Sequence, residues 1–405
     1  NKVAFERLTT PELGFDGTPD QTKGRIGIPS RPHPLVTRLS EDNYTKGLTG
    51  RNIAVWQSHG RYFNQNNGEW EWQRPCLFQT VEDMYTQGYV LPYLVPMLEN
   101  AGAYVLMPRE RDIQTNEVIA DQDASHRRYG VAEYFEKGRW TDAGTGFAAK
   151  KEIYTGLENP FITGTARKAD CAKDSRSTAS VEWRPSIPER GRYAVHISYK
   201  SLPESTKAAH YTVHHLGESE FIVNQSIGGG TWIYLGTFEF AEGQEGYVTL
   251  DNSTPQGYFH EKGSVITADA VRFGGGMGNI ARAKRGSKDE PVVSGMPRSA
   301  EGARYWLQWA GVPSDIFSPN EQKSDYKDDY MSRGDWVEWI SRGSDMNPSK
   351  KPGKGIPVDL SLGFHSDAGI TPNDSIVGTL AIYTLRSEGS EKLPGGELIL
   401  NAGNF

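Results

Sequence analysis

Two histidines that follow apolar segments are the residues most able to do chemistry in this chain of 405 residues. His59 lies in the run Asn52-Ile-Ala-Val-Trp-Gln-Ser-His-Gly60, and His365 ends the run Val358-Asp-Leu-Ser-Leu-Gly-Phe-His. Both apolar runs are typical of buried strands. Ligands of open α/β sheets collect at the carboxyl ends of the strands, so two strands that end on an imidazole can share a metal ion or a substrate. The sequence therefore predicts one site built from two distant segments.

An acidic helix start supplies the third candidate ligand. Glu82 and Asp83 follow Thr80, a plausible N-cap, and lie where carboxylates also suit the helix dipole without any metal. Two histidines and one carboxylate are a ligand set that zinc (Zn2+) accepts, and a catalytic zinc site keeps its fourth position for water. The metal would make hydroxide available at neutral pH. We favour Glu82 as the ligand, with Asp83 as the alternative.

The segments around these residues predict a parallel sheet. A helical face runs from the acidic start to Leu98, Ala101-Gly102 ends it, and Tyr104-Val-Leu-Met107 is typical of the next buried strand. Strand, helix and strand form a βαβ unit, whose right-handed crossover gives parallel strands. The predicted fold class is α/β, with an open, mostly parallel sheet and flanking helices.

The middle of the chain has a different pattern. From Ser180 to Phe273, short alternating segments are separated by turns such as Gly228-Gly-Gly230. This spacing predicts an inserted antiparallel β-sandwich, resembling a jelly roll. The predicted domains are an N-terminal arm or linker at 1–48, the first α/β part at 49–124, an irregular connector at 125–165, the sandwich at 166–278 and the second α/β part at 279–405.

The histidine segments resemble a known family. The stretch from Ile53 to Asp112, with its Ser-His-Gly, and the run Leu362-Gly-Phe-His-Ser-Asp-Ala368 resemble the zinc-dependent N-acetylmuramoyl-L-alanine amidases, which cleave peptidoglycan stem peptides. The resemblance implies that His59, Glu82 and His365 bind zinc. It also implies hydrolysis of the amide bond between N-acetylmuramic acid and L-alanine.

The general base is the point at which the chain departs from this family. Its members carry a second glutamate, in a late apolar strand, that acts on the zinc-bound water. Glu397 is the late candidate, and it lies closer to His365 than the family pattern leads one to expect. Either Glu397 is this base, or it is a surface residue and the base lies beyond Phe405 or is lost.

The inserted module resembles a second family, the golvesin C-terminal-like or xanthan-lyase-associated sandwich domain. The motifs are Trp183-Arg-Pro-Ser-Ile-Pro188, Gly191-Arg-Tyr-Ala-Val195, Gly229-Gly-Thr-Trp232 and Ala268-Asp-Ala-Val-Arg-Phe273. The resemblance implies carbohydrate binding without catalysis by the module itself.

Candidate substrate contacts flank the two histidines. Trp70 and Trp72 lie in the loop after His59, where an indole could stack on a sugar ring, although packing of the loop is an equal alternative. Asp367 belongs to the polar cluster that follows His365. We expect all three to contact a cell-wall glycan or glycopeptide.

The composition of the chain excludes several classes of binding partner. The net charge is −7 with basic residues scattered among acidic ones, which argues against nucleic acid or a membrane surface as the partner. No apolar run approaches the roughly 20 residues of a membrane span.

Cys76 and Cys171 are too few for a disulfide framework and are expected to be unbridged. We expect a monomer, either periplasmic or secreted, whose signal peptide has been removed.

Three functions remain as hypotheses. The first is the zinc amidase, and the second is a noncatalytic glycan-binding protein whose amidase-like half is degenerate. The third is a polysaccharide lyase of the xanthan type, which would need a Tyr, His or Arg constellation that the sequence does not supply.

Overall fold

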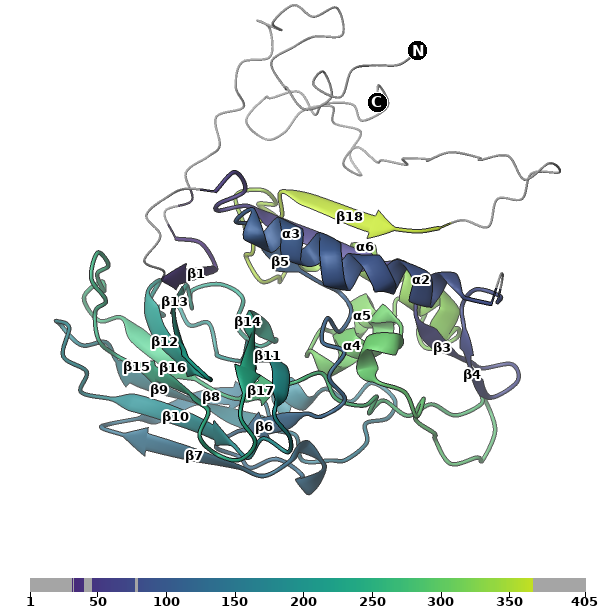
Figure 1. Ribbon diagram of the computed structural model, residues 1–405, viewed down its shortest axis with the longest axis horizontal. Helices are drawn as coiled ribbons and strands as arrows, with labels where there is room; N and C mark the ends of the chain where they lie inside the picture. Colours follow the sequence, from purple (N-terminus) through teal and green to yellow (C-terminus); the bar gives the residue numbers. More distant parts are fainter. Residues whose placement is uncertain (1–30, 32, 40–45, 77–78, 367–405) are drawn as a thin grey trace, which may run out of the picture. The chain divides into compact units, whose positions relative to one another are not determined.

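A computed structural model describes residues 31, 33–39, 46–76 and 79–366 (Figure 1). The described residues from His33 onwards belong to one compact unit. Asp367 and Glu397 lie outside the described residues.

Most of the strands belong to three antiparallel sheets. In spatial order, the six-stranded sheet contains β1 (Val36–Leu39), β13 (Glu218–Val223), β12 (Ala209–His214), β15 (Tyr247–Asp251), β10 (Ser180–Pro185) and β7 (Ala132–Lys137). The four-stranded sheet contains β14 (Ile233–Phe240), β11 (Gly191–Ile197), β17 (Val271–Phe273) and β6 (Val118–Ala120). The third contains β16 (Val265–Ala268), β9 (Gly164–Asp170) and β8 (Thr141–Gly146).

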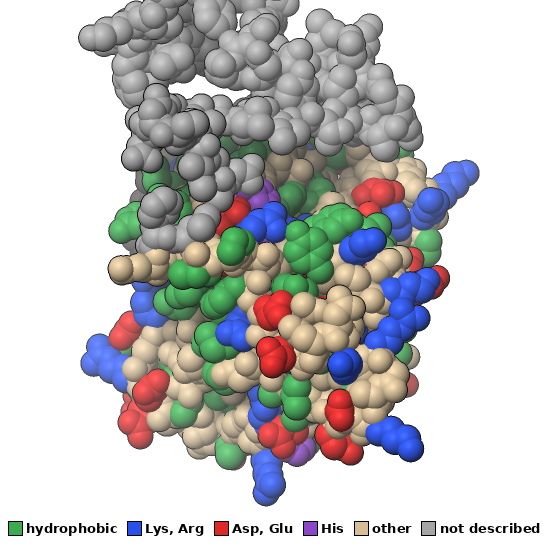
Figure 2. Space-filling model, turned by 90° about the vertical axis from the view of Figure 1, so that its right-hand side faces the viewer, with side chains coloured by type: hydrophobic (Ala, Val, Ile, Leu, Met, Phe, Trp, Pro, Cys, Tyr) green, Lys and Arg blue, Asp and Glu red, His purple; other side chains and the backbone are tan. Residues whose placement is uncertain are grey.

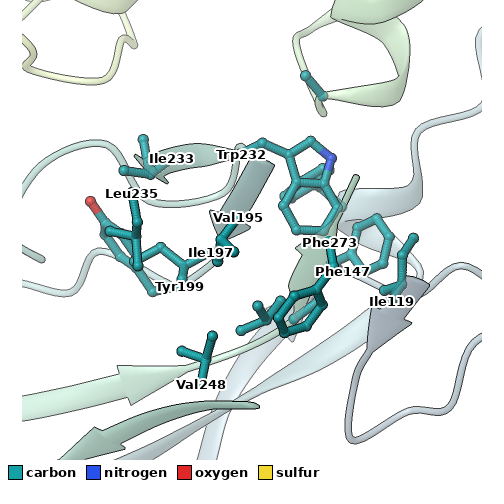
Figure 3. Close-up of a cluster of buried hydrophobic side chains, with 14 of the residues drawn as sticks. Ile119, Phe147, Val195, Ile197, Tyr199, Trp232, Ile233, Leu235, Val248 and Phe273 are labelled. Atoms are coloured by element: carbon teal, nitrogen blue, oxygen red, sulfur yellow. The ribbon is translucent and has the colours of Figure 1, made fainter. Parts of the chain in front are cut away.

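The sandwich forms because alternate residues of these strands are apolar, and those on one sheet pack against those on another. Strand β10 buries Val181 and Trp183 and leaves the intervening residues half-buried. The Trp183 indole donates a hydrogen bond to the Asp269 carbonyl over 2.7 Å, so its one polar group is satisfied in the core. Figure 3 shows another part of this core, where Trp232 packs against Phe147 with ring centroids 4.7 Å apart.

A small parallel sheet lies beside the sandwich. It contains β18 (Leu360–Phe364), β2 (Asn52–Gln57) and β5 (Tyr104–Leu106), with Leu360 opposite Ile53 and Asn52 opposite Tyr104. The predicted βαβ unit is therefore confirmed. Within the described residues, the predicted open α/β sheet consists of these three strands alone, and most strands belong to antiparallel sheets instead, because 279–366 folds mainly into helices and loops and adds only β18 to the parallel sheet.

Helical turns cover one face of the parallel sheet. They are α2 (Glu82–Tyr89), the π-helical turn η1 (Val90–Leu94) and α3 (Val95–Asn100). Pro92, which has no backbone N–H to donate, lies in the π-helical turn. Val90 and Val95 are buried in one cluster with Ile53, so an apolar stripe holds the helices on the sheet. The N-cap of α2 is Val81, without a side-chain hydrogen bond, and not Thr80.

The remaining elements complete the described chain. The hairpin contains β3 (Arg61–Asn64) and β4 (Glu69–Trp72); the later helices are α4 (Ala303–Trp309), α5 (Ser314–Phe317) and α6 (Asp325–Ser341); the 3-10 turns are η2 (Arg127–Tyr129), η3 (Pro160–Ile162) and η4 (Arg298–Ala300). None of the helices described is both long and apolar enough to cross a bilayer. Cys76 and Cys171 are free, as predicted.

Two segments predicted to be irregular contribute strands. Val36–Leu39, assigned to the arm, pairs antiparallel with β13. The connector at 125–165 supplies β7 and β8 to two of the sheets. The charged residues of β7 and the glycines of β8 weaken the local strand signal, and pairing with β10 and β9 decides their conformation. The predicted domain boundaries themselves remain a prediction.

Charged side chains are mixed on the surface. Figure 2 shows one face on which the basic and acidic side chains of the described residues are interspersed. This arrangement agrees with the scatter of charge along the sequence.

One histidine of the sandwich makes stability dependent on pH. His210 Nδ1 lies 2.8 Å from Asp251 and its Nε2 lies 2.9 Å from Glu220. Burial lowers the pKa of His210, but the hydrogen bonds and charges of the two carboxylates outweigh it and raise this pKa above its usual range. The pKa of histidine in the unfolded chain is about 6.5, so the protonated His210 stabilises the fold fully below about this pH. This stabilisation is lost as the pH rises through the higher pKa of His210 in the folded protein.

We expect His210→Gln to lower the free energy of unfolding by more at about pH 5.5 than at about pH 8.5, as measured by urea unfolding. His215 is a matched control, since burial lowers its pKa and the pH dependence of His215→Gln should have the opposite sign. An effect of His210→Gln that is the same at both pH values would contradict the prediction.

Candidate metal centre

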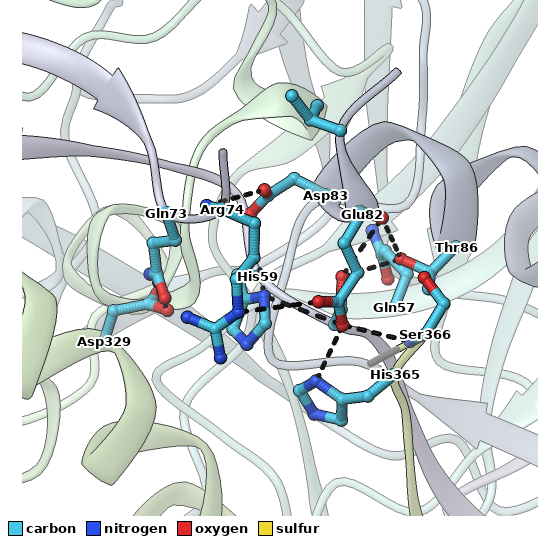
Figure 4. Close-up of polar contacts among 12 residues, drawn as sticks. Gln57, His59, Gln73, Arg74, Glu82, Asp83, Thr86, Asp329, His365 and Ser366 are labelled. Carbon is cyan, nitrogen blue, oxygen red and sulfur yellow. Dashed lines mark hydrogen bonds and ion pairs between the residues drawn. The ribbon is translucent and has the colours of Figure 1, made fainter. Parts of the chain in front are cut away.

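Three of the predicted ligands meet at the carboxyl end of the parallel sheet. His59 follows β2, His365 follows the neighbouring strand β18, and Glu82 begins α2 (Figure 4). The distance between His365 Nδ1 and Glu82 Oε1 is 3.2 Å, and the two imidazole centroids are 4.7 Å apart. One possible ligand atom from each residue lies within 4.8 Å of the others. The pairing of β2 with β18 thus brings the two distant segments together.

Two buried arginines fix the backbone that carries His59. Arg109 Nη1 donates hydrogen bonds to the carbonyls of Gln57, over 2.6 Å, and His59. Arg333 Nη1, from α6, donates to the Ser58 carbonyl over 2.6 Å. Three successive carbonyls are therefore held by guanidinium groups, and the loop after β2 has little freedom to move.

Arg109 also connects this loop to the chain that precedes α4. Its Nε donates to the Glu301 carbonyl and its Nη2 to the Ser299 carbonyl, each over 3.1 Å. The guanidinium is almost completely buried, and burial lowers the pKa of Arg109 to about 10. The group remains charged at neutral pH, so each of these hydrogen bonds has a cationic donor.

His59 is uncharged in the folded protein. Burial, together with the positive charges of Arg333 and Arg74, lowers the pKa of His59 to about 2. Its Nδ1 lies 3.9 Å from Glu82 Oε1 and 3.7 Å from Asp83 Oδ1, so neither contact is an ion pair at neutral pH. The neutral imidazole is the form that can bind a metal ion.

The two acidic candidates occupy different surroundings. Glu82 Oε1 contacts His365 and also accepts a hydrogen bond from the Ser366 backbone over 3.1 Å. Asp83 is fully buried, its Oδ2 accepts from the Arg74 backbone over 3.2 Å, and burial raises the pKa of Asp83 to about 6. Glu82 is the carboxylate that reaches both histidines, and its role as the ligand remains a prediction.

A divalent ion fits this set of side chains. His59 Nδ1 is buried and makes no hydrogen bond with the described residues, although a buried ring nitrogen normally has a partner. This nitrogen lies 3.9 Å from Glu82 Oε1, the oxygen that also contacts His365 Nδ1, and 3.7 Å from Asp83 Oδ1 (Figure 4). Two imidazoles and one carboxylate suit zinc, and they also suit other first-row divalent ions.

The two predicted sugar-stacking residues have packing partners within the chain. Trp70 lies 4.7 Å from Tyr305 between ring centroids, and its indole nitrogen donates to the Val292 carbonyl over 3.0 Å. Trp72 lies under the Arg61 guanidinium, 5.4 Å from the ring centroid. Their substrate role remains a prediction, as do the roles of Asp367 and Glu397, which lie outside the described residues.

Sequence reasoning missed the arginines around the centre. Arg109 had a usable signal, because it follows the buried strand β5 and so lies at the same end of the sheet as His59. Arg74 and Arg333 had no such signal in the sequence, because their proximity to the histidines depends on how the β3–β4 hairpin and α6 pack.

Comparison with known proteins identifies the sandwich. Residues 163–275 match the Golvesin C-terminal domain. A xanthan lyase from Bacillus sp. (strain GL1) is 34% identical over 102 residues, which are 24% of this chain and 10% of the lyase. The chain thus spans about a tenth of the length of this curated relative. The predicted resemblance of the inserted module is confirmed.

Solved structures with local similarity include two carbohydrate-active proteins. A Paenibacillus xanthan lyase has 22% identity and a TM-score of 0.29, over 39% of this chain and 13% of the lyase. CBM35 from Cellvibrio japonicus Abf62 has 14% identity and a TM-score of 0.25, over 40% of this chain and 94% of the module. The family match covers residues 163–275, and His59, Glu82 and His365 lie outside it, so the resemblance to amidases remains a prediction.

Proposed function

We propose that the protein is a zinc-dependent hydrolase that cleaves the amide bond between N-acetylmuramic acid and L-alanine in peptidoglycan or a related cell-wall glycopeptide. The observation that supports this most directly is the convergence of His59, Glu82 and His365 from three separate elements. The substrate lies outside the cytoplasm, so the protein would be periplasmic or secreted.

The surroundings of the proposed ligands suit this reaction. Zinc in such a site would polarise a carbonyl oxygen and make water a stronger acid. His59 is held rigidly by the carbonyl contacts of Arg109 and Arg333, which limits reorganisation of the site during the reaction. The His365 side chain is 37% exposed, so a substrate could approach from that side. Glu397 is the proposed general base.

The sandwich would hold the glycan. Its support is the match to the Golvesin C-terminal domain and the similarity to part of a xanthan lyase. The same match favours the second candidate, a noncatalytic glycan-binding protein. Lyase activity has weaker support, since the similarity covers a tenth of the lyase and no lyase constellation is recognisable in this chain.

Metal content and amide hydrolysis test the proposal together. We expect elemental analysis of the zinc-loaded protein to find about one zinc per chain. Incubation with N-acetylmuramoyl-L-alanyl peptides should release the L-alanine amine, stop when a chelator removes zinc, and resume when zinc is restored.

Different outcomes would separate the candidates. Binding of soluble peptidoglycan fragments without release of amine would favour the glycan-binding protein. An unsaturated sugar that absorbs in the ultraviolet, formed from xanthan, would favour the lyase. Absence of zinc from the protein after zinc is supplied would contradict the hydrolase.

A further inference from the structure

Arg74 is a fixed cation at the edge of the candidate metal centre. It follows β4, and its backbone N–H is tied to Asp83. Its Nε lies 3.5 Å from Glu82 Oε2, and its Nη1 donates a hydrogen bond to the Tyr326 hydroxyl over 3.0 Å. The guanidinium is therefore held on two sides, by α2 and by α6.

Arg74 differs from the other arginines around His59 in its access to solvent. Arg109 and Arg333 are almost completely buried, and backbone carbonyls together with Asp329 occupy their donors. The Arg74 side chain is 34% exposed, and its Nη2 makes no hydrogen bond with the described residues. Among these three arginines, Arg74 is therefore the one that can meet an incoming ligand.

The chemistry of such a guanidinium is selective. Arginine presents parallel N–H groups that match the two oxygens of a carboxylate, and a partly buried, preorganised fork loses little entropy when it binds one. The contact with Glu82 Oε2 is long for a hydrogen bond, so it leaves donor capacity for a ligand. A neutral ligand would gain less from this site than an anionic one.

We infer that Arg74 recognises a carboxylate of the substrate next to the scissile bond. The inference rests on the proposed function and specifies its substrate class: glycopeptides whose residue after L-alanine carries a free carboxylate. In a stem peptide with γ-linked D-glutamate, this group is the α-carboxylate. A stem peptide amidated at that position would be a poorer ligand.

A simpler role for Arg74 makes different predictions. If the guanidinium served only to orient Glu82, its removal would weaken zinc binding and would affect acidic and amidated ligands equally. If Arg74 binds the ligand carboxylate, its removal abolishes the preference between the two ligands and leaves zinc bound.

Two product peptides provide the probe, because neither contains the bond to be cleaved. One is L-alanyl-γ-D-glutamate with its γ-carboxyl blocked as the methylamide, and the other is the same peptide with an α-carboxamide. Calorimetry with the zinc-loaded full chain gives the two dissociation constants. We expect the acid to bind about 10- to 100-fold more tightly than the amide, as is typical of one charge-assisted hydrogen-bonded pair.

Substitutions of Arg74 test whether this residue causes the preference for the acid over the amide. Arg74→Gln should bring the ratio of the two dissociation constants close to one with zinc content unchanged, and Arg74→Lys should keep part of the preference. Arg139→Gln, at an exposed position between β7 and β8, is the matched control and should behave as wild type.

Several results would overturn the inference: equal binding of the two peptides, binding of neither, an unchanged preference in Arg74→Gln, or loss of zinc from that variant with parallel weakening of both peptides. Release of amine from N-acetylmuramoyl-L-alanyl-γ-D-glutamate tests the proposed function separately. A preference for the acid without release of amine would refute the hydrolase and leave carboxylate recognition in place.

Discussion

His365→Ala should lower zinc affinity by more than about 100-fold and reduce amide hydrolysis to background, since loss of a ligand should exceed the 10- to 100-fold effect typical of residues that only support ligands. His365 supplies one of three converging ligand atoms, and its removal leaves an imidazole and a carboxylate. The side chain is partly exposed, so the free energy of unfolding of the metal-free protein should change by less than about 1 kcal/mol.

Zinc-buffer titration, turnover of N-acetylmuramoyl-L-alanyl peptides and urea unfolding of the metal-free protein measure the three quantities. His33→Ala is the control, because the His33 side chain is exposed and its contact with Asn224 is made by its backbone carbonyl. Full zinc affinity in His365→Ala would show that the three residues do not form the metal site.

The candidate site could be predicted where short segments carry the information. His59 and His365 each end a strand, and parallel pairing of β2 with β18 puts both at one sheet edge. The helix that begins at Glu82 starts from the same edge. Local pattern and one topological rule were therefore enough to bring these three residues together.

The central strands of the sandwich could also be predicted from short segments, whereas its edge strands could not. Strands such as β10 and β11 show apolar alternation or β-branched residues, whereas β7 is charged and β1 follows a Pro-rich stretch. Edge strands gain their structure from backbone hydrogen bonds to a partner, so their own sequence carries a weak signal.

The arginines around the site show a further limit. The hydrogen bond from Arg333 to the Ser58 carbonyl joins residues 275 positions apart, and it requires α6 to pack beside the β3–β4 hairpin. A guanidinium satisfies carbonyls of any sequence, so nothing in the residue types around Ser58 indicates which arginine will meet them. Such contacts depend on tertiary packing, which periodicity does not encode.

Arg109→Met should lower the free energy of unfolding by about 3–5 kcal/mol, because it removes a buried charged group on which several partners depend. Methionine fills much of the volume of arginine but donates no hydrogen bond. The carbonyls of Gln57 and His59, and those of Ser299 and Glu301, would lose the donor that now joins them.

The same substitution should affect the metal centre without touching a ligand. When the His59 carbonyl is released, the loop after β2 gains freedom, and the imidazole spends less time facing Glu82 and His365. We therefore expect zinc affinity to fall about 10- to 100-fold, as is typical when a residue that supports a ligand is removed. Arg176→Met, at a highly exposed position, should change stability by less than about 0.5 kcal/mol and leave zinc binding intact. A destabilised Arg109→Met that keeps wild-type zinc affinity would mean that Arg109 supports the fold and not the geometry of the centre.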